Sequence, residues 1–239
     1  VGPGSYPERV QIRAGGSADA PLVFKAAGRV RMRGFTIRAD HVTIQGFEIT
    51  DTDNTWDDGV GIFVEASHCT LHDNYVHFAT RGGILLHGEQ GEEGAAANCL
   101  VENNRLYRNA LVGIDVHGKN HVVRGNEIWG TIQYHPRWTD PPNWVDADGI
   151  RFFGSGHVIS DNYIHHITFA DPENVDPHID CFQTWGPAYN IGFHRNWCSA
   201  LEYQSRSERG KGFMIEEQYS PVRDLTITNN LILAFNHVT

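Results

Sequence analysis

Charged side chains that could do chemistry are concentrated in three short segments in the second half of the chain. The segments are DADGIR at 146–151, HIDCFQTW at 178–185 and GKGFMIEE at 210–217. Together they supply five carboxylates, one imidazole and two cations: Asp146, Asp148, Asp180, Glu216, Glu217, His178, Arg151 and Lys211. Carboxylates that lie side by side repel each other, so they need a cation or a shared proton between them. Whether these groups meet depends on the elements that carry them.

An internal repeat indicates what those elements are. Six asparagines each follow an apolar residue by three positions and precede another by two: Asn74, Asn104, Asn126, Asn162, Asn196 and Asn230. Asparagine tolerates a left-handed backbone, and its amide can bond to the asparagine of the neighbouring copy. We therefore predict a structural asparagine ladder at one turn of a stacked, repeated unit.

A second motif lies upstream of the asparagines. Its copies are GIFVE at 61, GILLH at 83, GIDVH at 113, GIRFF at 149, CFQTW at 181 and GFMIE at 212. Each copy has the period-2 alternation of a short strand, and helix-length periodicity is weak throughout. Repeated units of this kind predict an all-β parallel solenoid. In this register Ile62, Ile84, Ile114 and Ile150 form one inward column.

Aligning the strands brings the charged groups together. Stacked strands lie about 4.8 Å apart, so Asp148 should face Asp180, with Lys211 one step beyond. Because Ca²⁺ takes oxygen ligands, we predict that Asp146, Asp148 and Asp180 bind calcium in an exterior groove. A solvated acidic turn, neutralised by Arg151 and Lys211, is the alternative.

Outward positions of the neighbouring columns could contact a ligand. The predicted substrate contacts are Asp115, His117, Gln183, Trp185 and Glu216, together with Trp144. Trp144 lies in the segment 129–148, which is long and rich in aromatic residues. Such segments in compact domains are usually functional, so we expect this one to wall one side of the groove.

The chain resembles the right-handed parallel β-helices of the pectate-lyase-like superfamily over residues 22–239. That resemblance implies about seven coils and a saccharide groove along the first strand of each coil. ADGIRF at 147, HIDCFQTW at 178 and GKGFMIEE at 210 follow the motif order of calcium-dependent pectate lyases. Asp148 and Asp180 match two calcium ligands of that family. Gln183 stands where a later aspartate is found, and Met214 where the catalytic lysine is found.

The resemblance and these residues predict a polysaccharide lyase that cleaves a uronate-containing glycan by β-elimination. Arg151 or a bound cation would neutralise the uronate carboxylate, and the base would be Lys211 or, second, His178. Activity would then depend on metal and rise with pH. A glycoside hydrolase that uses Asp148 and Asp180 as its acid pair is an alternative. A non-catalytic carbohydrate-binding or surface solenoid is another, because a fold does not determine a function.

The amino-acid composition argues against some classes of binding partner. The chain has 239 residues, 29 acidic against 19 basic side chains and a formal net charge of −10, which argues against a nucleic-acid partner. No apolar run is long enough for a membrane helix. We expect one domain over 1–239, possibly truncated at one or both ends, in a monomer. The family resemblance implies secretion or a periplasmic location. Cys69 and Cys99 share one inward position in adjacent copies and could be bonded or free.

Overall fold

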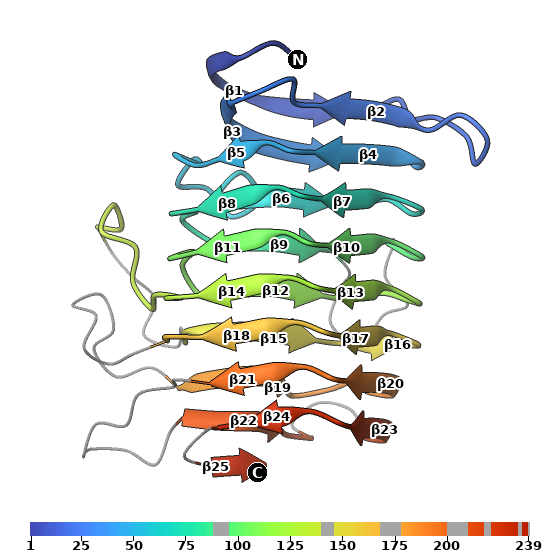
Figure 1. Cartoon of the computed structure of the whole chain (residues 1–239), viewed down its shortest axis with the longest axis vertical. Coiled ribbons are helices and arrows are strands. Elements are labelled where there is room, and N and C mark those ends of the chain that lie inside the picture. Colours follow the sequence, from blue (N-terminus) through green and yellow to red (C-terminus); the bar gives the residue numbers. More distant parts are fainter. Residues whose placement is uncertain are drawn as a thin grey trace.

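Short parallel strands wound into a stack of coils make up the molecule (Figure 1). This computed structural model describes residues 1–87, 96–139, 146–167, 178–199, 210–217, 221–233 and 236–238. Among those residues there is no helix, and hence none that could cross a membrane. Every pair of neighbouring named strands is parallel, as expected for a solenoid in which each coil runs in the same direction.

Three stacks of strands form the walls. The first stack contains the second half of β3 (Val30–Ile37), then β6 (Val60–Val64), β9 (Gly82–Leu86), β12 (Val112–Val116), β15 (Asp148–Phe152), β19 (Ile179–Thr184), β22 (Gly210–Ile215) and β25 (Asn236–Val238). The second contains β2 (Leu22–Lys25), β4 (Val42–Gln45), β7 (Thr70–His72), β10 (Leu100–Glu102), β13 (Val122–Arg124), β17 (Val158–Ser160), β20 (Ala188–His194) and β23 (Val222–Thr228), with β16 (Gly154–Ser155) beside β20. The third contains β5 (Glu48–Ile49), β8 (Tyr75–His77), β11 (Arg105–Tyr107), β14 (Glu127–Trp129), β18 (Tyr163–His165), β21 (Trp197–Ser199) and β24 (Leu231–Ile232).

The coils follow one another in chain order. They begin with β3, β4 and β5 and end with β22, β23 and β24, and β1 (Gly4–Ile12) pairs with β3 above them. The described strands therefore complete seven coils, which confirms the expected number.

The core is the inside of the stack, and its columns match the predicted register. Ile62 pairs with Ile84, Ile84 with Ile114, and Ile114 with Ile150, and all four side chains are fully buried. Phe182 and Phe213 continue this column with stacked rings 4.7 Å apart. Burial of an aliphatic side chain stabilises a fold by roughly 1.5–3 kcal/mol, so a column that continues through six coils is a major source of stability.

The predicted asparagine ladder is present. Each side-chain oxygen accepts a backbone N–H from the preceding coil, as Asn104 does from Asn74 and Asn126 from Asn104, at 3.0 and 2.9 Å. Each side-chain nitrogen donates to a backbone carbonyl, such as that of Val101 for Asn126. One detail of the prediction is wrong. The left-handed residue is the one before each asparagine, for example Asp73 with φ 59°, because the amide itself must point inward to the next coil.

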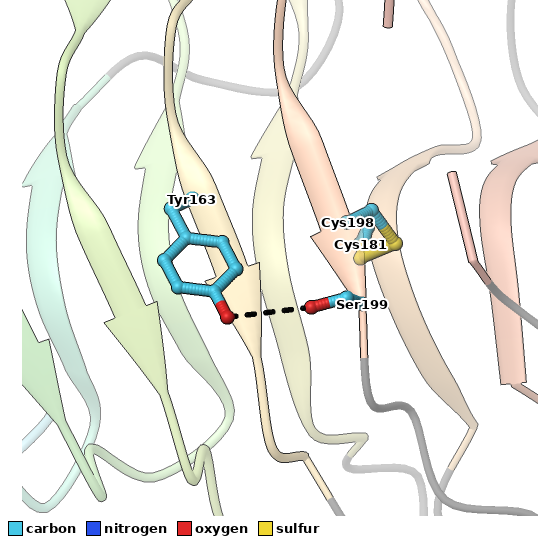
Figure 2. The surroundings of a disulfide bond; sticks show 4 residues. All are labelled: Tyr163, Cys181, Cys198 and Ser199. Atoms are coloured by element: carbon cyan, nitrogen blue, oxygen red, sulfur yellow. Dashed lines mark hydrogen bonds between the residues drawn. A yellow bond between two sulfur atoms is a disulfide. The ribbon is translucent and has the colours of Figure 1, made fainter. Parts of the chain in front are cut away.

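A disulfide occupies a place where the other coils have a glycine and an aliphatic residue. In the coil above, a Cβ on Gly149 would meet Ile164 at 2.7 Å, so the glycine makes room for the larger side chain. Cys181 takes the glycine position, and Cys198 pairs with Ile164 across the coils. Figure 2 shows their bond between β19 and β21, with Cα atoms 6.2 Å apart.

The other two cysteines are not bonded. Cys69 and Cys99 are buried free thiols, as one of the two predicted possibilities had it. Their sulfur atoms donate to backbone carbonyls inside the turn, for example that of Ala66 for Cys99. These thiols therefore belong to the packing of the turn.

Candidate functional site

A pocket of about 770 Å³ lies on the outward face of the first stack, across β9, β12, β15, β19 and β22. Most of the predicted site residues line it: Asp115, His117, Asp146, Arg151, His178, Gln183, Trp185 and Glu216. We call this the first-strand pocket. The groups come from one column position or its neighbours in successive coils, because outward side chains in paired strands lie side by side. Trp144, also predicted to bind substrate, lies outside the described residues.

Three other predicted site residues do not line the pocket. Asp148 and Asp180 are fully buried, so their predicted position in an exterior groove is wrong. Asp148 lies beneath the pocket, where its Oδ2 accepts a hydrogen bond from the pocket residue Arg151. Lys211 pairs with Asp180 in the next coil, as predicted, but its Nζ lies 3.1 Å from the sulfur of Met214.

Arg151 lines the pocket, and its contacts with Asp148 and Trp185 fix its position. Its Nε donates to Asp148 Oδ2 at 2.7 Å, and its guanidinium lies 5.4 Å from the ring centre of Trp185. Only 8% of the residue is exposed. Burial alone would lower the pKa of Arg151, but Asp148, Asp115 and Asp146 together raise it. The guanidinium is therefore permanently charged and held in one orientation.

The two buried aspartates sit under Arg151 as a pair. Burial raises the pKa of Asp148, and burial together with the neighbouring Asp148 carboxylate raises that of Asp180 further. Both oxygens of Asp180 and Oδ1 of Asp148 have no hydrogen-bond partner within the described parts of the chain. Because two adjacent buried carboxylates cannot both stay ionised beside a single paired arginine, the pair retains a proton near neutral pH.

Whether Asp148 and Asp180 could bind Ca²⁺ depends on how many oxygen ligands they supply. Orphaned carboxylate oxygens are the kind of ligand that Ca²⁺ takes, but the ion needs six to eight of them. In the described ranges no three histidine, cysteine, aspartate or glutamate side chains come together as a metal site. In addition, Asp148 Oδ2 already accepts a hydrogen bond from Arg151. These donors alone do not make a calcium site, so the calcium site remains a prediction and no step below depends on it.

Asp115 and His117 form a pair that we predicted only as separate contacts. His117 Nε2 lies 3.0 Å from Asp115 Oδ1, because residues two apart in a strand point to the same side. Burial favours a higher pKa for Asp115, but the charges of His117, Arg151 and His87 outweigh it and hold that pKa below its ordinary value. The carboxylate is therefore ionised and orients the imidazole.

An aromatic wall continues from this pair. The His117 ring stacks on Phe153 with ring centres 4.6 Å apart, and Phe153 meets Trp185 edge to face at 4.7 Å. All three side chains line the pocket. Apolar ring surface beside polar groups is a common arrangement for binding the flat faces of sugars.

His178 and Asp146 lie next to each other just before β19 and β15. The backbone N–H of His178 donates to Asp146 Oδ1 at 3.0 Å, and both side chains line the pocket. The imidazole is only half-buried. His178 therefore presents its imidazole ring to the interior of the pocket.

Sequence reasoning missed one end of the pocket. Trp56 and Arg81 line it there, and Trp138 packs against Arg81. Trp138 belongs to the segment 129–148 that we expected to wall the groove; it contacts Arg81 but is not itself a lining residue. The missed signal is the position of Arg81, which directly precedes β9 and is therefore brought to the mouth of the first-strand stack.

Comparison with known proteins identifies the fold family. The family described as "Right handed beta helix region" matches residues 28–128 and 61–237. Among curated proteins, none matches the sequence.

Comparison with solved structures finds similar chains at low identity. An alginate lyase from Paenibacillus sp. str. FPU-7 is 12% identical, with a TM-score of 0.60, over 100% of this chain and 89% of that one. A PL6 family polysaccharide lyase from Pseudopedobacter saltans is 11% identical, with a TM-score of 0.34, over 97% and 87%. The Agl-KA catalytic domain is 14% identical, with a TM-score of 0.46, over 100% and 62%. The stacked parallel coils and the family match together show that the chain belongs to the right-handed β-helix family.

Proposed function

We propose that this protein is a polysaccharide lyase that cleaves a uronate-containing glycan in the first-strand pocket. The observation that carries the proposal is Arg151, a fully charged guanidinium fixed in the pocket by Asp148, with imidazoles and aromatic rings around it. The likeness in fold to an alginate lyase supports the same reaction class.

Arg151 would bind the carboxylate of the uronate at the cleavage point. A guanidinium pairs well with a carboxylate, and the interaction strengthens in a partly buried site. Neutralising that carboxylate lowers the free energy of the carbanion that forms beside it when the C5 proton leaves. Asp148 keeps Nε occupied, so the remaining N–H groups of Arg151 are available to the substrate.

His178 would take the C5 proton. Imidazole titrates near neutral pH, which suits a general base, and this ring is half-buried in the pocket. The electron pair of the C5–H bond then forms the C4–C5 double bond, the bond from C4 to the glycosidic oxygen breaks, and that oxygen takes a proton from water. Lys211, the base preferred from sequence, is not among the pocket residues, so His178 carries the proposal.

Trp185 and Phe153 would support the sugar rings, while Asp115, Gln183 and Glu216 would contact hydroxyl groups. The disulfide between Cys181 and Cys198 fits a secreted or periplasmic protein, since such bonds persist in oxidising compartments.

A glycoside hydrolase is the second candidate, on a specific observation. Asp115, Asp146 and Glu216 all place carboxylates at the pocket, and pairs of carboxylates cleave glycosidic bonds. The pair named from sequence, Asp148 and Asp180, is buried and not among the lining residues.

Product chemistry separates the candidates. The protein is incubated with alginate, polygalacturonate and a neutral glucan, with and without EDTA. A lyase produces unsaturated ends that absorb in the ultraviolet, a hydrolase produces reducing ends without that absorbance, and a binding module produces neither. We expect His178→Ala to abolish the absorbance and Lys211→Ala to retain it. Full activity in His178→Ala contradicts the assignment of the base, and reducing ends alone contradict the lyase.

A further inference from the structure

We propose that Arg81, held between Trp56 and Trp138, forms a second carboxylate-binding subsite of the first-strand pocket. It would bind a uronate unit several sugars away from the unit at Arg151. The inference rests on the proposed function, since it assigns a substrate with acidic groups along its length.

The Arg81 side chain is partly buried, because two tryptophan rings pack against its guanidinium. Its guanidinium carbon lies 5.3 Å from the ring centre of Trp56 and 4.6 Å from that of Trp138. Trp56 and Arg81 both line the pocket. Rings that pack against a guanidinium leave its N–H edge as the place for a partner. That edge suits a planar, bidentate anion such as a carboxylate.

Within the described residues, Arg81 has no counter-ion that would make this arrangement purely structural. Its Nε is buried without a hydrogen-bond partner, and within the described ranges its side chain forms no salt bridge. Arg151 in the same pocket, by contrast, is paired with Asp148. A partly buried, uncompensated charge is costly, and an anionic ligand would remove that cost. Trp56 remains 53% exposed, which leaves apolar surface for a sugar ring beside the charge.

The spacing of the two arginines indicates the length of the ligand. Arg81 precedes β9 and Arg151 lies on β15, with β12 between them. Two coil steps separate them by about 10 Å along the solenoid axis, before the offset along the strands is added. A single uronate cannot reach both cations, but a short oligomer can. The pocket should therefore prefer polyuronates to glycans with one isolated acidic unit.

The test compares Arg81→Gln with Arg81→Lys, Trp56→Ala and a matched control, Arg124→Gln. Arg124 is an exposed arginine that pairs with Glu102 on the second stack. Oligouronates of increasing length are titrated by calorimetry at low and high salt, and KM and kcat are measured wherever cleavage occurs. Thermal melting checks that each variant is folded.

We expect Arg81→Gln to weaken binding of long oligouronates about ten-fold, to leave the shortest ones unaffected and to reduce the salt dependence. The loss should appear in KM rather than in kcat. Arg81→Lys should recover part of the affinity, Trp56→Ala should show a smaller loss for the same long ligands, and Arg124→Gln should match wild type.

The outcomes separate this inference from the proposed function. If wild type cleaves polyuronate and Arg81→Gln binds long oligomers as wild type does, the subsite is wrong and the lyase stands. If nothing is cleaved but long oligouronates bind in an Arg81-dependent way, the subsite stands and the lyase is wrong. If no oligouronate binds to wild type at all, both are wrong.

Discussion

The asparagine turn and the first-strand pocket are built on the same stacking of coils, but they use it in opposite ways. At the turn, each coil repeats one residue, and each asparagine satisfies the backbone of its neighbour. On the first stack, the outward column changes at every coil and reads Phe63, Leu85, Asp115, Arg151, Gln183 and Met214. Identical neighbours give stability, while unlike neighbours bring different chemical groups within reach of one ligand.

The two regions also differ in how completely their polar groups are paired. The ladder amides have partners on both sides, at distances of 2.8–3.1 Å. Under and around the pocket, Asp180, His117 Nδ1 and Gln183 Oε1 are buried without hydrogen-bond partners in the described structure. Unpaired buried polar groups are costly, and functional sites are where proteins most often retain them.

Arg151→Gln should have the largest effect. It removes the charge at the proposed cleavage point and leaves Asp148 without its cation, so we expect kcat/KM on polyuronate to fall at least about 1000-fold. The change is measured by the appearance of unsaturated ends, with Arg124→Gln as the control for loss of a surface arginine. A variant that keeps a tenth or more of the activity would remove Arg151 from the reaction.

Asn126→Ala should have the largest effect on stability. It deletes three donated and two accepted hydrogen bonds in the middle of the ladder, and we expect a loss of about 3 kcal/mol in the free energy of unfolding. Asn230→Ala at the end of the ladder is the matched control and should cost about 1 kcal/mol, because that site is only partly buried. Denaturant unfolding measures both. Equal losses would mean that the ladder is not cooperative.

Asp180→Asn should stabilise the protein at alkaline pH. The folded-state pKa of Asp180 is raised by burial and by Asp148, so the folded state holds a proton that the unfolded state releases above about pH 4. Wild-type stability therefore falls as pH rises through this window, whereas the amide does not titrate. We expect Asp180→Asn to be about 2 kcal/mol more stable at about pH 8, with no gain at about pH 4. A gain that is independent of pH would contradict the buried, protonated carboxyl.

The same variant tests the calcium site predicted from sequence. Titration of wild type with Ca²⁺ should release or absorb heat, and Asp180→Asn should lose that heat. An unchanged heat in the variant, or none in wild type, removes Asp180 as a ligand.

The smallest expected effect on stability concerns two buried histidines, His121 and His157, that form a second ladder at the turn after the first stack. His121 Nδ1 accepts the backbone N–H of Cys99, and His157 Nδ1 accepts that of His121. Burial lowers the pKa of His121 to about 3 and that of His157 to about 4. The unfolded state binds protons below about pH 6.5 and the folded state does not, so stability is lost as pH falls.

His157→Asn should reduce that loss. At about pH 5.5 each buried neutral histidine costs about 1.4 kcal/mol relative to neutral pH, and the variant should lack one such contribution. Melting temperatures of wild type and variant between neutral and mildly acidic pH measure the difference. Parallel curves would show that His157 does not remain neutral in the fold.

Local patterns in the sequence determined the repeat and its register. The spacing of the asparagines and the alternation of the strands predicted the ladder, the inward isoleucine column and the grouping of Asp115, Arg151 and Gln183 on one outward face. This succeeded because neighbouring coils in a solenoid pair residue with residue, so one register applies to the whole stack.

Only the tertiary structure decided which groups face the ligand. Asp148 and Asp180 were assigned to the exterior groove, but both are buried, and Asp148 is bonded to Arg151. The sequence pattern does not show which side chains cover others. The disulfide joins Cys181 to Cys198 because one occupies a glycine position and the other an aliphatic position that meet inside the coil. Arg81, Trp56 and Trp138 meet although Trp56 and Trp138 lie in segments between strands, whose positions no repeat predicts.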